Sequence, residues 1–341
     1  MSSEQESARP NVPSSAFEGE DLRERVFGLR TAVLRSDTVT GVFDRINSRE
    51  SILATAQAGV GLGWMLFFLF APLLYIVTLS FWQRGAGGVI IQTFTLSNYE
   101  FILTQNVELA SLTFKNLYLT ILFQSLKYGV FVTIGTLLLG YIPAYFLGRT
   151  VSKWKAVFLL LVVLPFWVPL IIRYYSWILV LGNKGLIVSM FGWVGIEIGG
   201  FLYTELAVIS GLTQALLPFM ILPIYNSVNE IDSSLIESAK TMGATPLRTF
   251  YEVTLPLTMP GVSAGIILVF ILSVGSYMAP ALLGAPSNTM VANLIETTFG
   301  QNLNWPLASA MGVVYLVVLF AIISVFNRFV GLDEVFGGDA E

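Results

Sequence analysis

The residue types that carry most enzyme chemistry are missing from this sequence. Its 341 residues include neither His nor Cys, which excludes serine–histidine triads, histidine proton relays, thiolate chemistry and metal sites built on imidazole. No G-x-x-x-x-G-K-[ST] stretch is present that could cradle nucleotide phosphates in a P-loop. The sequence therefore predicts no catalytic residues, no metal site and no cofactor.

The most polar interior stretch is residues 237–260, which lies between two long apolar runs. Ser234 precedes Glu237 by three residues, a spacing typical of a capping box at the start of a helix. Positions spaced i, i+4 and i+7 predict one apolar stripe on this short helix. The stripe consists of Leu235, Ala239 and Met242.

The residues that follow predict a turn and a second short helix. Gly243 comes where the first helix is expected to end, and glycine adopts the left-handed conformation there with little strain. Thr245 and Pro246 are suited to the N-cap and the first helical position. Pro256 and Pro260 are expected to break the chain before the next apolar run. The whole stretch is thus predicted to be a rigid helix–turn–helix at a membrane face.

This stretch resembles the EAA loop of ABC-importer permeases, in which Glu-Ala-Ala is followed at set distances by Gly and by Ile-x-Leu-Pro. Ser238 stands where that pattern has Ala, and Val253 where it has Ile. In that family the first short helix docks into a groove on a cytoplasmic ATPase subunit and transmits its motion. The resemblance implies a coupling loop made by Glu237, Ser238, Ala239, Met242, Gly243, Leu255 and Pro256. The alternative is an ordinary amphipathic loop between membrane helices.

The composition is that of a polytopic membrane protein. Hydrophobic residues make up 55% of the chain and charged residues 12%, about half the charged share of a soluble protein. The net charge of −4 gives no reason to expect nucleic acid. Residues 1–50 form a polar extension without a signal peptide. Its beginning is expected to be disordered, and residues 21–47 to be either a surface amphipathic helix or a solvated tail.

Six apolar segments are long enough to cross a ~30 Å hydrocarbon core, and they must be helical because lipid offers no partners to backbone polar groups. The predicted spans are about 57–82, 121–147, 156–180, 204–228, 260–283 and 307–328. Together they predict an all-α transmembrane domain over residues 51–330, followed by a short acidic cytoplasmic tail, 331–341.

The short loops predict the orientation of these helices. Arg149, Lys153 and Lys155 lie in one loop without an acidic residue, whereas residues 284–305 contain no Lys or Arg. Since basic loops stay on the cytoplasmic side, the 149–155 and 229–259 loops are expected to be cytoplasmic. The chain is therefore predicted to be a multi-pass protein of the cell membrane with both termini in the cytoplasm.

A second stretch, residues 164–187, is similar to the third-helix segment of spermidine/putrescine-type permeases. The match is carried by Leu164-Pro165-Phe166-Trp167, Arg173, Tyr174, Trp177, Leu181-Gly182 and Gly185-Leu186-Ile187. With the EAA-type loop, the resemblance covers about 57–330. It implies a non-catalytic permease subunit that moves a polyamine by alternating access. The implied partners are an ABC ATPase dimer, a second permease forming a heterodimer, and an extracytoplasmic substrate-binding protein.

Other functions stay open from the sequence. Permeases for other small organic solutes fit the same resemblance. An ion-coupled secondary carrier or channel is disfavoured because no span has Asp or Glu in its middle. An intramembrane enzyme is disfavoured because no constellation of reactive groups is present.

Within the third span, Pro165 and Pro169 are expected to kink the helix. Arg173 is the sole permanent charge well inside a span and, counted along a straight helix, lies about 25 Å along it, in the outer half. It either anchors the helix by snorkelling outward or belongs to a translocation path or gate. Aromatic neighbours could contact a cation by cation–π attraction or simply pack at the interface. They are Trp167, Tyr174, Tyr175 and Trp177.

Overall fold

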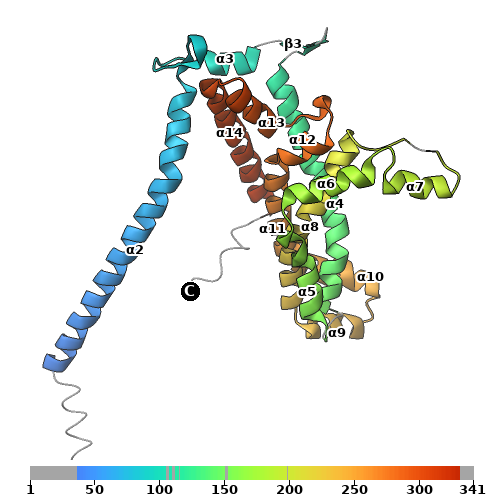
Figure 1. Cartoon of the computed structure of the whole chain (residues 1–341). Helices are drawn as coiled ribbons and strands as arrows, with labels where there is room; N and C mark the ends of the chain where they lie inside the picture. The colour runs from blue at the N-terminus through green and yellow to red at the C-terminus, as the bar shows by residue number, and fades with distance from the viewer. Residues whose placement is uncertain are drawn as a thin grey trace, which may run out of the picture. The chain divides into compact units, whose positions relative to one another are not determined.

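The computed structural model describes residues 37–104, 107–109, 112–114, 116–149, 153–197 and 199–330 (Figure 1). The chain divides into two units, Met1–Leu73 and Leu74–Glu341. The first residues of the predicted N-terminal extension and the predicted acidic tail at 331–341 lie outside the described residues.

The first unit contains most of one long helix, α2 (Asp37–Ser80). Its apolar part, Gly59–Ser80, is long enough to cross a membrane, in agreement with the span predicted at 57–82. The same helix runs across residue 50, where the sequence predicts the end of a polar extension. Of the segment 21–47, the described residues from Asp37 onward are helical, and residues 21–36 lie outside the described residues.

The second unit is built on three helices that contact one another closely: α4 (Leu117–Arg149), α8 (Glu205–Glu230) and α11 (Leu255–Val274). Small residues allow this approach, as expected of membrane helices. A Cβ at Gly261 would lie 2.4 Å from the carbonyl oxygen of Pro223. The fourth long helix, α14 (Trp305–Val330), packs mainly against shorter elements of this unit and contacts these three helices less.

The third predicted span is a helix pair bent at a break and not one straight helix; counted as one span, it gives the predicted total of six within the described residues. It consists of α5 (Lys155–Val163), a 3₁₀ turn η2 (Leu164–Trp167) and α6 (Leu170–Leu181), followed by α7 (Leu186–Trp193). The two legs meet at 92°. The kink predicted at Pro165 and Pro169 is confirmed, because neither proline can donate a helix hydrogen bond. The depth counted for Arg173 along a straight helix is wrong for the same reason.

The fifth span also differs from the prediction of 260–283. The apolar helix runs over Pro246–Val274, through α10 (Pro246–Thr249), the π-helix η3 (Phe250–Thr254) and α11. Pro256 and Pro260 therefore do not break the chain. Pro256 lies in the first turn of α11, just after the π-helix, where the amide of Leu255 bonds the carbonyl of Phe250. This wider turn accommodates a residue that lacks a backbone donor.

Shorter elements connect the spans. Between α2 and α4 lie β1 (Gln83–Arg84), η1 (Ala86–Gly88), β2 (Ile90–Ile91), α3 (Ser97–Thr104), β3 (Val107–Leu109) and β4 (Leu112–Phe114). Two antiparallel hairpins pair β1 with β2 and β3 with β4. Between α11 and α14 lie α12 (Met278–Leu283), η4 (Pro286–Asn288), α13 (Val291–Glu296) and the π-helix η5 (Thr297–Gln301).

Candidate functional site

The short helix of the predicted helix–turn–helix is α9 (Ser233–Thr241), and Asp232 caps it. The Asp232 carboxylate accepts a hydrogen bond from the backbone amide of Ser234 at 2.9 Å. The predicted capping box, with Ser234 as N-cap, is therefore wrong. The helix begins one residue after Asp232, which places Ser234 inside the first turn, and a carboxylate satisfies a free amide there.

This cap also affects the acidity of Asp232. The hydrogen bonds from Ser234 stabilise the ionised carboxylate and lower its pKa below the ordinary value, and the positive charge of Arg149 acts in the same direction. Arg149 is the last residue of α4. Its electrostatic effect on Asp232 indicates that the end of this membrane-spanning helix lies near the start of α9.

The turn after α9 agrees with the prediction. Gly243 has φ +88°. Its amide donates to the carbonyl of Lys240 at 2.9 Å, and the amide of Ala244 donates to that of Ala239 at 3.1 Å. This pair of bonds is a Schellman motif, which satisfies the last carbonyls of a helix and needs a left-handed residue.

The second short helix, α10, also begins as predicted. Thr245 is its N-cap, and the Thr245 hydroxyl accepts from the amide of Arg248 at 3.3 Å. Pro246 follows at the first helical position, where its missing donor costs nothing. The turn from α9 into the fifth span is thus held by local contacts.

The apolar stripe of α9 is only partly covered by the described chain. Ala239 is buried, whereas Leu235 is 48% and Met242 82% exposed. Glu237 and Ser238 are also exposed. Apart from the buried Ala239, the predicted coupling residues at 237–243 are exposed, whereas Leu255 and Pro256 lie beyond α10 and η3, at the start of α11.

An aromatic cluster connects this segment to α4, and the sequence analysis missed it. The Phe250 ring lies edge-on to Tyr141 at 5.7 Å and to Tyr145 at 6.1 Å between ring centroids. The Tyr141 hydroxyl is 3.0 Å from that of Thr258 in α11. The two tyrosines sit one helical turn apart on α4, which is the signal that could have indicated a shared partner.

The second predicted group lies around the break between α5 and α6. A cavity of about 390 Å³ is lined by residues of η2, α6, α8 and the α11–α12 connection, among them Phe166, Arg173, Tyr174, Phe219 and Tyr277. A neighbouring cavity of about 180 Å³ is lined by Arg173, Ser176, Trp177, Val180 and Gln214.

The structure brings together only part of the predicted group. Arg173 and Tyr174 line the larger cavity, and Trp177 lines the smaller one with Arg173. Trp177 donates through its indole nitrogen to the Gln214 side chain at 3.4 Å. Trp167 and Tyr175 line neither of these two cavities and are exposed.

The guanidinium of Arg173, like that of Arg149, has buried nitrogens without a hydrogen-bond partner among the described residues. In Arg173 these are the Nε and Nη1 atoms. A snorkelling anchor would carry these nitrogens out to water. Their burial next to two cavities therefore disfavours the anchor interpretation and favours a site for a ligand or partner.

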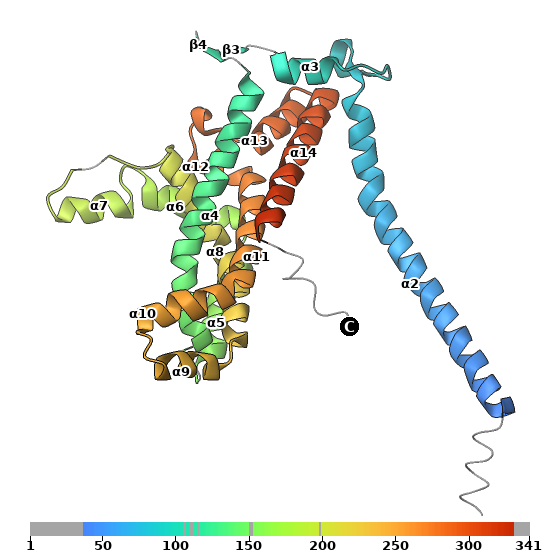
Figure 2. The same cartoon turned by 180° about the vertical axis from the view of Figure 1, so that it is seen from behind.

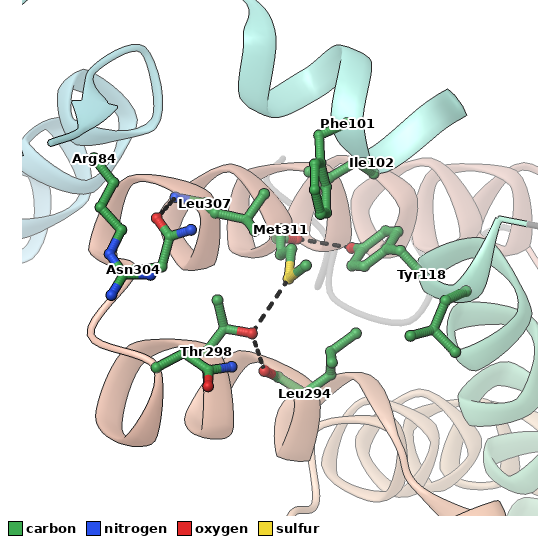
Figure 3. A pocket seen from close by; sticks show the side chains of 11 residues that line it. Arg84, Phe101, Ile102, Tyr118, Leu294, Thr298, Asn304, Leu307 and Met311 are labelled. Carbon is green, nitrogen blue, oxygen red and sulfur yellow. Dashed lines mark hydrogen bonds between the residues drawn. The ribbon is translucent and has the colours of Figure 1, made fainter. Parts of the chain in front are cut away.

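A third cavity, of about 240 Å³, lies between α3, α4, α13–η5 and α14 (Figure 3). Tyr118 donates its hydroxyl proton to the carbonyl of Met311 at 2.7 Å, and Thr298 donates to that of Leu294 at 2.7 Å. Because these hydroxyls are engaged with helix carbonyls, the cavity interior is mainly apolar, with Arg84 and Asn304 toward one end (Figure 3).

Comparison with known proteins identifies clear relatives. Residues 136–332 match the family model described as "Binding-protein-dependent transport system inner membrane component". The chain is 33% identical to the spermidine/putrescine transport system permease protein PotB of Escherichia coli (strain K12), over 78% of this chain and 94% of that protein. It is 36% identical to PotB of Haemophilus influenzae, over 78% of this chain and 90% of that protein.

A more distant relative and a solved structure agree with this. The inner membrane ABC transporter permease protein YdcU of Escherichia coli (strain K12) is 29% identical over 81% of this chain and 92% of its own length. The fold is similar to that of a chain in a bacterial ABC transporter involved in the import of the acidic polysaccharide alginate. That match has a TM-score of 0.68 at 18% identity and covers 83% of this chain and 96% of the other. The predicted all-α, multi-pass membrane fold is confirmed.

Proposed function

Because the chain belongs to the family of inner-membrane components of binding-protein-dependent transport systems, we propose that it moves polyamines such as spermidine and putrescine as the non-catalytic permease subunit of an ATP-driven importer. The observation that carries the solute class is the similarity to spermidine/putrescine permeases over most of both chains. The aromatic lining of the cavity beside α6 is consistent with a cationic solute, since aromatic rings attract cations.

In this proposal α9 is the element that an ATPase subunit moves. Its exposed Met242 and Leu235 provide an apolar face for a groove on that subunit. The helix that follows is continuous from Pro246 to Val274, so a displacement at α9 would reach the middle of the membrane. Closure of the ATPase dimer would then convert the bundle between inward-facing and outward-facing states.

Contacts at the same end of the molecule support a proposal for its orientation. Lys155, at the start of α5, bonds the side chain of Asn229 near the end of α8, and its ammonium lies 5.1 Å from the centre of the Tyr225 ring. The basic loop and α9 are therefore at one end of the second unit (Figure 2). We place this end, with both chain termini, in the cytoplasm, because basic loops and an ATPase-docking helix both belong there.

We extend the proposal to the domain limits, the solute path and the partners. The transport domain is proposed to be residues 51–330, flanked by cytoplasmic extensions at 1–50 and 331–341. The solute path or its gate is proposed at Trp167, Arg173, Tyr174, Tyr175 and Trp177. The partners are proposed to be an ABC ATPase dimer, a second permease and an extracytoplasmic binding protein.

The test is uptake of labelled spermidine and putrescine into liposomes that contain this chain with its ATPase, companion permease and binding protein. Saturable uptake that requires both ATP and the binding protein is expected. ATP hydrolysis stimulated by the loaded binding protein, without polyamine uptake, would retain the importer and reject the solute. Uptake without the ATPase would reject the importer and indicate a secondary carrier.

A further inference from the structure

The break between η2 and α6 places non-helical backbone inside an apolar segment. The chain is not helical at Val168 and Pro169, and the legs on either side diverge by 92°. Non-helical backbone at membrane depth is tolerated only where protein covers it or where it lines a water-filled cavity. Within the described chain Trp167 is 78% and Val168 37% exposed. The described residues of the second unit therefore leave this face of the break open, and it needs a covering element.

Arg173 lies one helical turn after the break, and its positive charge has no ion-pair partner among the described residues. Its Nε and Nη1 atoms are buried and unpartnered among the described residues. Neither cavity that it lines has an Asp or Glu among its lining residues. A charge in the membrane interior is costly unless it is paired, and a guanidinium is matched in geometry by the two oxygens of a carboxylate.

Three described acidic groups have partners of their own in the second unit. Glu205 pairs with Lys127 at 2.8 Å, and Glu252 with Arg248 at 2.9 Å. Asp232 caps α9. Among the described residues, no carboxylate lines either cavity beside Arg173.

We propose that Arg173 binds a carboxylate of the companion permease, which covers the break at Trp167–Leu170 at the interface between the two permeases. The inference rests on the proposed function, which supplies the companion. A polyamine has no anionic group for a guanidinium, so the solute is not the source. A lipid phosphate is not the source either, because lipid against this face would leave non-helical backbone without partners.

The test uses the complete complex with Arg173→Lys, which keeps the charge and supplies a primary amine. A water-soluble carbodiimide joins an amine to a carboxylate only when the two are in contact. Mass spectrometry is expected to find the peptide that contains position 173 joined to an Asp or Glu of the companion permease. The matched control is Leu179→Lys on an exposed position of the same helix, which is expected to give no such product.

A second measurement does not depend on cross-linking. Arg173→Gln is expected to retain roughly tenfold less companion permease through purification than the unsubstituted chain, because loss of one member of a charge pair leaves the other buried and unpaired. Arg173→Lys is expected to retain most of it. Both results together would support the interface.

Three outcomes would overturn the proposal. The first is a cross-link from position 173 to a carboxylate of this chain. The second is the absence of any cross-link together with full retention of the companion permease in Arg173→Gln. The third is full retention in Arg173→Gln with loss of uptake restricted to carboxylate-bearing solutes, which would make the solute the source. Polyamine uptake by the unsubstituted complex is measured separately, so failure of the proposed function is seen independently.

Discussion

The ring of Phe250 lies edge-on to the ring of Tyr141, with an angle of 88° between their planes. Phe250 begins the π-helix between α10 and α11, and Tyr141 belongs to α4. This contact joins the segment that follows α9 to a second membrane-spanning helix. A displacement of α9 would therefore be passed to α4 as well as to α11.

We expect Phe250→Ala to reduce solute uptake per ATP hydrolysed, because it removes the edge-to-face ring contacts to Tyr141 and Tyr145 on α4, each worth about 0.5–1.5 kcal/mol. The measurement is uptake and ATP hydrolysis on the same reconstituted complex. Phe250→Tyr retains the ring and is expected to preserve the ratio. An unchanged ratio in the alanine variant would show that this cluster only stabilises the fold.

Gly243→Asp is expected to abolish solute-stimulated ATP hydrolysis while the protein still inserts into the membrane. No atom lies within 4 Å of a Cβ built at Gly243, so the cost is backbone strain at φ +88° of about 1–2 kcal/mol and not a clash. Gly243→Asn is the matched control. Asn and Asp enter the left-handed region about equally, so Asn should reproduce the loss if backbone strain causes it and should retain hydrolysis if the added charge causes it. Normal stimulated hydrolysis in the aspartate variant would contradict the coupling role of this turn.

The helix crossing at Gly261 predicts a large loss of stability for Gly261→Ala. The added methyl would meet the Pro223 carbonyl oxygen at 2.4 Å and the Ser227 hydroxyl at 2.5 Å, and overpacking of this kind costs about 1–3 kcal/mol or more. Gly312→Ala is the control, because no atom lies within 4 Å of its added Cβ. Thermal unfolding in detergent compares the two. Equal midpoints would show that α8 and α11 separate without cost.

The cap of α9 is expected to depend on pH. Because the pKa of Asp232 is lower in the folded chain, its stabilisation is present above the unfolded pKa of about 3.9 and is lost as the pH falls through the lower folded value. The protection factors of amides in the first turn of α9, which are exchange rates corrected for the intrinsic effect of pH, should therefore fall at acid pH. Asp232→Asn should remove this dependence while it keeps a capping oxygen. Protection that falls equally in both proteins would point to another group.

Much of the fold could be predicted from the sequence because the signals are local. Spans follow from apolar length, and the turn at Gly243 follows from glycine placed after a short amphipathic helix. The start of α10 follows in the same way from Thr245 and Pro246. These features depend on a few neighbouring residues, and the structure agrees with them.

The errors have equally local causes. The predicted capping box at Ser234 competed with a carboxylate at Asp232, which is as good an N-cap and comes first in the chain. The predicted break at Pro256 and Pro260 did not allow for the preceding π-helix, which carries the helix through. In both places the sequence contains the residues that decide the structure, but it allows the helix to begin, or to continue, at more than one position.

By itself the sequence determined the class of the protein, the approximate number of its spans and the site of its short polar helix. Only the tertiary structure decided that α5 and α6 diverge by 92° and that Phe250 packs between Tyr141 and Tyr145. It also decided that the guanidinium of Arg173 is buried beside two cavities. These features depend on contacts between residues far apart in the chain, for which no short pattern of residue types is specific.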